Sequence, residues 1–102
     1  MSSENLHVPR ASLSRTTLDL HYAITSLIEE LEAVDWYRQR ADDTADSALK
    51  AILLHNAREE IEHASMVLEW IRRNDKDFDS QLRKFIFQPG SIAGHEEDAK
   101  ES

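Results

Sequence analysis

The chain contains no cysteine, only two glycines and two prolines, and no long run of apolar residues. Without cysteine it can form neither disulfides nor zinc-thiolate sites, and it has no thiol nucleophile. Because its only glycines are Gly90 and Gly94, it has no glycine-rich loop that could bind a nucleotide phosphate. No apolar run is long enough to cross a bilayer, and no signal-peptide core is visible near the beginning. These absences predict a cytoplasmic protein without a membrane partner.

Basic residues are also scarce. The 12 Lys and Arg residues are outnumbered by 20 Asp and Glu residues, and the net charge is -8. Because nucleic acids and anionic membranes are bound through basic patches, we expect neither as a partner. With 102 residues the chain is at most one small domain, and such a chain can bury only a limited share of its surface alone. The composition therefore suits a protein that attracts cations and associates with a partner chain.

The sequence is rich in helix-forming stretches. Residues 12–40 contain neither glycine nor proline, and their apolar residues recur at spacings of three and four, which predicts one long helix. Its apolar stripe consists of Leu13, Leu20, Ala23, Ile24, Leu27, Leu31 and Val34. The following segment, DDTADS over residues 42–47, contains turn and capping residues. Asp43 or Thr44 could cap a second helix, whose first turn Asp46 would favour through the helix dipole.

The helical pattern continues after this turn. A second long helix is expected over about residues 46–73, where Arg72 and Arg73 complement the negative end of the helix dipole. A short third helix is expected from Phe78 to just before Pro89. Because the first connection is short, the two long helices must form an antiparallel hairpin. The predicted fold is therefore all-α, an antiparallel two-helix hairpin plus a short C-terminal helix. Its expected parts are a flexible N-terminus at 1–8, the helical domain at 9–88 and a disordered acidic tail at 89–102.

A candidate site lies in HNAREEIEHASMVLEW, residues 55–70 of the second helix. At about 100° per residue, Glu60 and His63 fall on the apolar side, whereas Glu62 is on the opposite side and Glu59 at the edge. An ionised carboxylate on an apolar face is unfavourable without a cation, and no Lys or Arg shares this face. We therefore expect a metal ion at the Glu60-x-x-His63 motif.

The first helix offers a matching carboxylate in EELEAVDWY. Glu30 borders the apolar stripe, whereas Glu29 and Glu32 point to the other side together with Thr25 and Trp36. Tyr37 follows Glu30 by two turns on nearly the same side, so its hydroxyl could form a hydrogen bond near that carboxylate. Of the three glutamates, only Glu30 can therefore face the same core as the motif on the second helix.

These residues amount to half of a known type of site. A four-helix di-iron carboxylate bundle takes one Glu from each of two helices and a Glu-x-x-His motif from each of the other two. One chain supplies Glu30, Glu60 and His63. A dimer would complete the four-helix bundle, and its four carboxylates would balance the charge of two Fe2+ ions. Without metal these carboxylates would repel one another, so iron is expected to strengthen the dimer.

Two stretches together are similar to one protein family. EELEAVDWYRQRAD, residues 29–42, and HNAREEIEHASMVLEWIRRND, residues 55–75, resemble the encapsulated ferritin family, the ferritin-like cargo of encapsulin shells. The similarity extends from about Leu6 to Pro89. The resemblance implies a ferroxidase that oxidises Fe2+ to Fe3+ with dioxygen at a di-iron site shared between two subunits. Its product would feed iron storage inside the shell.

The resemblance also assigns residues by position. Glu30, Glu60 and His63 of each chain would be the catalytic iron ligands, with Glu60 as the bridging carboxylate. Glu29 and Glu32 would form an outer entry site, where calcium can replace iron, and Trp36 and Tyr37 would lie near the di-iron site.

The family further implies a ring-shaped decamer built from dimers, located inside an encapsulin nanocompartment in the cytoplasm. Family members that enter a shell usually carry an apolar C-terminal targeting peptide. The last residues of this chain, HEEDAKES, do not resemble one. Encapsulation is therefore expected from the resemblance alone.

Three alternatives remain open at this point. His55-x-x-x-Glu59 has the spacing of a haemerythrin-type ligand pair, although both residues lie at or outside the edge of the apolar stripe. A metal could instead join the dimer without turnover, as in a scaffold protein. Finally, Glu60 and His63 could pair with each other across the dimer of a helical interaction module.

Overall fold

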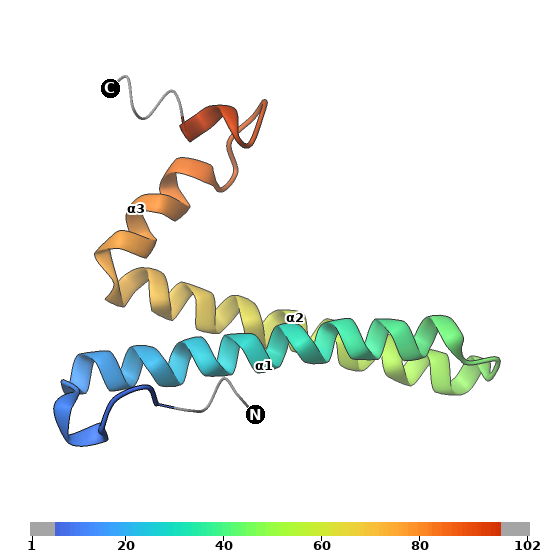
Figure 1. The fold of residues 1–102 in the computed structure, drawn as a ribbon. Coiled ribbons are helices and arrows are strands. Elements are labelled where there is room, and N and C mark those ends of the chain that lie inside the picture. The colour runs from blue at the N-terminus through green and yellow to red at the C-terminus, as the bar shows by residue number, and fades with distance from the viewer. Residues whose placement is uncertain (1–5, 97–102) are drawn as a thin grey trace.

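The computed structural model describes residues 6–96. A 3-10 helix, η2 (Arg10–Ser12), precedes three α-helices, α1 (Arg15–Asp43), α2 (Ser47–Asn74) and α3 (Lys76–Phe85). Helices α1 and α2 lie side by side in antiparallel directions, and α3 leaves the end of α2 at an angle (Figure 1). Residues 6–96 contain no strand. The all-α hairpin with a short third helix is thus confirmed. Within the same range, no helix has the length and apolar character that a membrane span requires.

The helix ends differ slightly from those expected. The cap of α2 is Asp46, whose Oδ1 accepts a hydrogen bond from the Leu49 N–H at 2.8 Å. The expectation that Asp43 or Thr44 would be this cap is wrong, because α1 itself continues through Asp43. The Thr44 hydroxyl accepts the Asp46 N–H at 3.2 Å instead. Pro9 is the N-cap of η2 and directly precedes that 3-10 helix.

The interface between the two long helices is narrow and contains small residues. On α2, Ala57, Ala64 and Ile71 are buried at a spacing of seven. On α1, Thr25 is only 8% exposed, which corrects its expected place on the outer side with Glu29 and Glu32. The helical wheel suggested one core-facing side for α1, but the side that meets α2 is rotated from the apolar stripe. As a result Leu31, a member of that stripe, is 55% exposed.

A single chain leaves much of its apolar surface open. The exposed large side chains on the long helices are Tyr22, Ile28, Leu31, Trp36, Leu49, Ile52, Ile61, Met66 and Trp70. A soluble monomer rarely leaves so many large apolar groups in contact with water. The small size of the chain gives the physical reason, because two helices alone cannot cover both sides of each other. The surface is suited to contact with further helices.

The two ends of the chain were expected to be flexible or disordered. Residues 1–5 and 97–102 lie outside the described residues, so that expectation is not tested there. Arg10 donates a hydrogen bond from Nη2 to the Tyr22 hydroxyl at 2.6 Å, which joins η2 to α1. Near the other end, the Gly94 N–H donates to Ser91 Oγ at 3.1 Å.

Candidate metal centre

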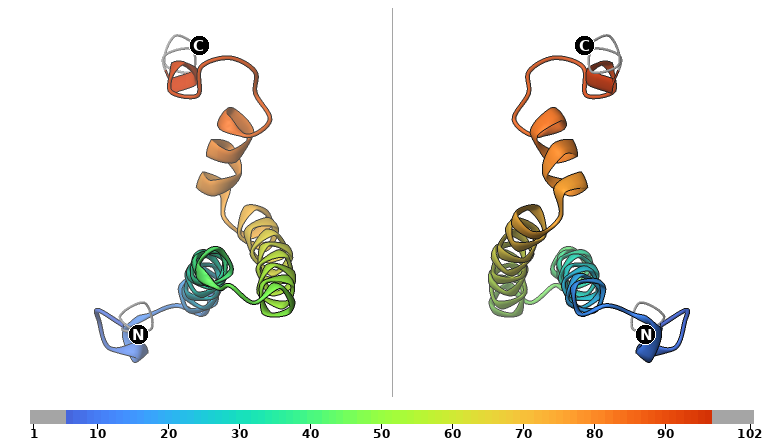
Figure 2. Two further views of the ribbon diagram at one scale, coloured as in Figure 1. Left: turned by 90° about the vertical axis from the view of Figure 1, so that its right-hand side faces the viewer. Right: turned by 90° about the vertical axis from the view of Figure 1, so that its left-hand side faces the viewer.

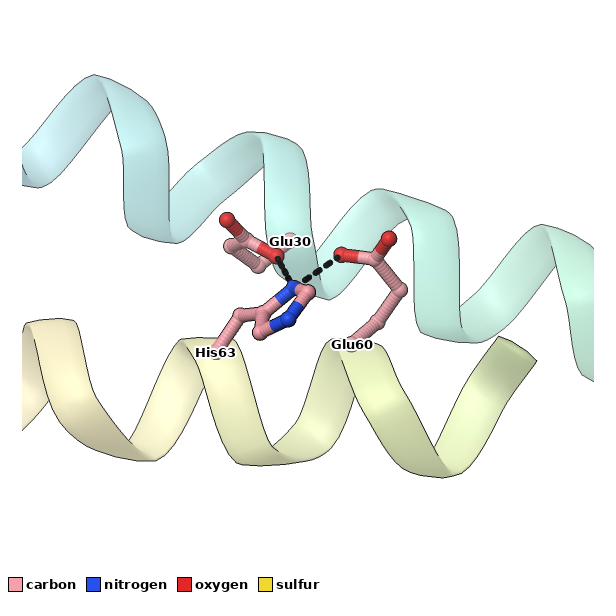
Figure 3. A group of neighbouring side chains, drawn as sticks. All are labelled: Glu30, Glu60 and His63. Carbon is pink, nitrogen blue, oxygen red and sulfur yellow. Dashed lines mark ion pairs between the residues drawn. The ribbon is translucent and has the colours of Figure 1, made fainter. Parts of the chain in front are cut away.

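Three side chains converge between the two long helices. Glu30 comes from α1, and Glu60 and His63 come from α2 (Figure 3). His63 Nδ1 lies 3.4 Å from Glu30 Oε2 and 3.6 Å from Glu60 Oε2. One ligand atom from each residue lies within 4.8 Å of the other two, and residues 6–96 hold no second group of this kind. The structure therefore brings together the three residues that were selected as metal ligands.

The packing of small residues explains why the three groups meet. Glu60 stands between Ala57 and Ala64 along α2, which are 2% and 7% exposed. Because alanine has a short side chain, α1 can approach this part of α2 closely. Thr25 is buried on the α1 side, one and a half turns before Glu30. The close approach places the Glu30 carboxylate over the Glu60-x-x-His63 motif.

The site is covered on one side and open on the other. The side chains of Glu30 and Glu60 are 21% and 25% exposed, whereas that of His63 is 45% exposed. Glu30 Oε2 is inaccessible to solvent and has no hydrogen-bond partner among residues 6–96. Its contact with His63 Nδ1 at 3.4 Å is long for a hydrogen bond. A buried carboxylate oxygen without a donor is costly, and a bound cation would remove that cost.

Electrostatics point in the same direction. Interaction with the neighbouring Glu60 carboxyl raises the pKa of the Glu30 carboxyl, and partial burial and the negative charge of Glu60 add to this effect. His63 acts in the opposite sense and lowers it. Two carboxylates and an imidazole form a hard donor set with one borderline nitrogen ligand, which suits iron and similar divalent ions. The residues present therefore fit the metal that was expected.

This raised pKa makes a testable contribution to stability. At pH values below 4.5, the usual pKa of the group, Glu30 is protonated in both the folded and the unfolded chain. As the pH rises through the higher pKa of the folded state, that state must ionise a carboxyl that the unfolded chain has already ionised. The free energy of unfolding should therefore fall over this window. We expect the metal-free Glu30→Gln variant to lose less stability than the parent chain as the pH rises from 4.5 through the higher pKa of the folded state.

The measurement is denaturant unfolding in the presence of a chelator across that pH range. Glu62→Gln is the matched control, because Glu62 is exposed on α2 and its substitution removes the same charge outside the site. A parallel decline in the parent and Glu30→Gln chains would contradict the assignment of this effect to Glu30.

The remaining predicted residues lie outside this group. Glu29 is exposed and Glu32 is half-buried, and neither joins Glu30 at the convergence point. Trp36 is 47% exposed. The guanidinium carbon of Arg40 lies over the ring of Tyr37, 5.7 Å from the ring centre. The outer site and the proximity of the two aromatic residues stay predictions.

The haemerythrin-type pair, His55 and Glu59, is not joined by further metal ligands among residues 6–96. His55 Nε2 and Glu59 Oε1 are 3.5 Å apart, and both side chains are largely exposed. No third His or acidic residue joins this pair among residues 6–96. The pair is accounted for as an exposed contact between successive turns of one helix.

A second polar network was missed from the sequence. Arg72 and Arg73 were read only as charges at the end of a helix, but Arg72 connects Glu69 on α2 with Asp79 on α3. The Glu69-to-Arg72 spacing is visible in the sequence. The contact with Asp79 depends on the direction of α3, which no local pattern specifies.

A helical hairpin that presents a Glu from one helix and a Glu-x-x-His motif from the other is a ferritin-like arrangement. The comparisons with known proteins identify its family. The family model described as EncFtn-like matches residues 5–89. The chain belongs to this encapsulated ferritin-like family.

Individual relatives agree with this assignment. The chain is 50% identical over 95 residues to the "Encapsulated ferritin-like protein" of Rhodospirillum rubrum, covering 93% of this chain and 68% of the relative. It is 43% identical over 96 residues to the "Ferritin-like protein" of Thermotoga maritima, covering 94% of this chain and 84% of the relative. A crystal structure of a Nitrosomonas europaea protein superimposes with a TM-score of 0.84 at 53% identity, covering 87% of this chain and 98% of the other.

Proposed function

We propose that this protein is a ferroxidase that oxidises Fe2+ to Fe3+ with dioxygen at a di-iron site formed by two copies of the chain. The observation that carries the proposal is the convergence of Glu30, Glu60 and His63 around the partnerless Glu30 Oε2. Membership of an encapsulated ferritin-like family supports iron as the metal.

The need for two copies follows from the incompleteness of the site. One chain offers two carboxylates and one imidazole, and His63 remains 45% exposed on the open side. A second copy would double these ligands and supply the four carboxylates that neutralise two Fe2+ ions. The exposed apolar side chains Leu31 and Trp70 belong to the helices that carry the site, so they provide surface for such a contact. A ring-shaped decamer of these dimers is the larger assembly that we propose from the family.

The protein residues position and neutralise the substrate ions. Each Fe2+ gives up one electron, so a pair of ions reduces one dioxygen molecule by two electrons to the level of hydrogen peroxide, with two protons taken up from the solvent. Carboxylate oxygens are hard ligands and favour the ferric product over the ferrous substrate. The imidazole of His63 adds a neutral nitrogen ligand, which leaves the charge balance to Glu30 and Glu60.

The surroundings of the reaction are part of the same proposal. Glu29 and Glu32 would attract metal ions at an outer site, which calcium can also occupy, and Trp36 and Tyr37 would lie near the di-iron site in the dimer. The description of the Rhodospirillum rubrum relative as an encapsulated ferritin-like protein supports an encapsulin shell as partner. The enzyme would then act in the cytoplasm inside an encapsulin nanocompartment and supply Fe3+ for storage there.

Oxygen consumption tests the activity directly. Anaerobic protein is loaded with Fe2+ and mixed with aerated buffer while dissolved oxygen and ferric absorbance are recorded. We expect oxidation well above the protein-free rate, with a first phase that saturates at two Fe2+ per dimer. Bound iron that is oxidised no faster than in buffer would instead support a metal-joined scaffold and refute the enzyme. Absence of bound iron would support the interaction module, in which Glu60 and His63 pair with each other across the dimer.

A further inference from the structure

A network of ion pairs spans the corner between α2 and α3. The guanidinium group of Arg72 donates from Nε and Nη2 to the two carboxylate oxygens of Glu69 at 2.7 and 2.9 Å. Its third nitrogen, Nη1, donates to Asp79 Oδ1 on α3 at 2.5 Å. All three nitrogens of this planar group are therefore engaged, and one of them crosses from one helix to the next.

Two further arginines form pairs that stay within one helix. Arg73 Nε donates to Glu69 Oε2 at 2.6 Å within α2. Arg83 Nε donates to the two Asp79 oxygens at 3.0 and 3.1 Å within α3. Of these three arginines, only Arg72 connects the two helices.

Opening of the bridge would leave each carboxylate of the network paired with another arginine. If Arg72 separates from Asp79, Asp79 keeps Arg83, Glu69 keeps Arg73, and Arg72 keeps Glu69. No carboxylate is left without a cation, so the penalty for an isolated buried charge does not arise. The side chains of Arg72 and Asp79 are 28% and 32% exposed, so salt in the solvent reaches the pair.

Protonation of Glu69 or Asp79 would open this bridge only in strong acid. Hydrogen bonds from Arg72, and then from Arg73, lower the pKa of Glu69 to about 2. Arg83 and Arg72 likewise hold the pKa of Asp79 below its usual value. Both carboxylates are therefore ionised around neutral pH, and ionic strength is the variable to which the bridge responds.

The connection beneath the bridge has the form of a hinge. Asp75 is the single residue between the end of α2 at Asn74 and the start of α3 at Lys76, and its backbone is extended, with φ -140° and ψ 114°. Helix α3 extends away from the hairpin and packs against α2 but not against α1 (Figures 1 and 2). An open groove with a volume of about 640 Å³ lies between α2 and α3. The apolar residues that line it are Leu68, Leu82, Ile86 and Phe87.

We propose that the Arg72–Asp79 ion pair is a latch across a hinge at Asp75. It holds α3 in its observed direction and releases the helix when the pair is screened or removed. The proposal is independent of iron oxidation, because the network shares no residue with the metal centre. Its consequence is that the direction of α3, and the groove between α2 and α3, depend on ionic strength.

Distance measurements between α2 and α3 test the latch. Because the chain has no cysteine, Glu62→Cys on α2 and Gln81→Cys on α3 provide two unique labelling sites at exposed positions. Spin-labelled chains are mixed with an excess of unlabelled chains, so that only distances within one chain are recorded. We expect one narrow distance in the parent at low salt, and a broadened or shifted distribution in Arg72→Gln and in Asp79→Asn. The parent should approach the Arg72→Gln distribution at about 1 M salt, where the Debye length is about 3 Å.

The matched controls are Arg73→Gln and Arg83→Gln, which remove the same charge from the same network but leave the bridge in place. Glutamine keeps a helix propensity close to that of arginine. A narrow, unshifted distance in Arg72→Gln, or equal broadening in the two controls, would overturn the latch.

Amide hydrogen exchange separates release of α3 from general unfolding. In Arg72→Gln the amides of α3 should exchange roughly two- to fivefold faster, while those of α1 and α2 keep their rates. Equal acceleration in all three helices would show a loss of overall stability and would contradict the proposal.

Discussion

Replacing any one of the three converging residues is expected to lower the rate of Fe2+ oxidation by about a hundredfold or more. Changes in groups that only orient a metal ligand already cost about 10- to 100-fold, so loss of a ligand itself should reach the upper end of that range. The most informative variants are Glu30→Gln, Glu60→Gln and His63→Ala. The two glutamine variants keep the size of the side chain and remove its charge. His63→Ala removes the only nitrogen ligand of the group.

These variants are compared by initial rates of ferric absorbance under iron concentrations that saturate the parent protein. Glu62→Gln is the matched control, because it removes one carboxylate from the exposed side of α2 at the same distance along the helix. This control should keep the parent rate. Equal losses in Glu62→Gln and Glu60→Gln would mean that the total negative charge of the chain attracts iron and that the converging group is not the site of oxidation. Full activity in His63→Ala would remove that residue from the ligand set.

The control of side-chain size strengthens this comparison. A Glu→Gln change at Glu30 also removes the carboxylate repulsion that raises the pKa of this group, so the fold should be at least as stable without metal as that of the parent. A loss of activity with unchanged or higher stability can then be assigned to lost iron binding. A loss of activity accompanied by unfolding would carry no such assignment, which is why stability is measured on the same preparations.

The parts of this site that were predictable from the sequence follow from local helix geometry. Glu60 and His63 are one turn apart, so their common side was visible from spacing alone. The partner Glu30 could be selected because it is the one glutamate of its stretch that borders the apolar stripe. The short connection then required an antiparallel hairpin, and this arrangement brings the two helices together at the right level.

The parts that were not predictable depend on tertiary contacts. Thr25 was placed on the outer side of α1, yet it is buried, because the side that meets α2 is set by the small residues Ala57 and Ala64 and not by the most apolar stripe. A helix that contacts two neighbours buries two different faces. A helical-wheel projection with one apolar stripe does not tell which neighbour that stripe contacts. The Arg72–Asp79 contact was missed for a similar reason, because it depends on the direction that α3 takes after Asp75.

Removal of metal is expected to weaken association of two chains by about a hundredfold for each ion that the dimer binds. A ligand that binds only the associated form, at a concentration about 100 times its dissociation constant, contributes about 2.7 kcal/mol, which corresponds to that factor. The physical cause is the set of four carboxylates that two copies of Glu30 and Glu60 would place around one cavity. Two unit charges about 4 Å apart repel by roughly 4 kcal/mol at an effective dielectric constant near 20. Divalent ions replace this repulsion with attraction.

Sedimentation under anaerobic conditions, with Fe2+ or with a chelator, measures this coupling. The parent chain should shift to larger species when Fe2+ is added. Glu30→Gln removes two of the four negative charges in a dimer. In chelator it should therefore associate more strongly than the parent, and added Fe2+ should increase its association less. Glu62→Gln should follow the parent, since its exposed carboxylate lies on the other side of α2. A parent profile that is identical with and without Fe2+ would separate metal binding from association. The exposed apolar surface around Leu31 and Trp70 would then be sufficient to hold the copies together without metal.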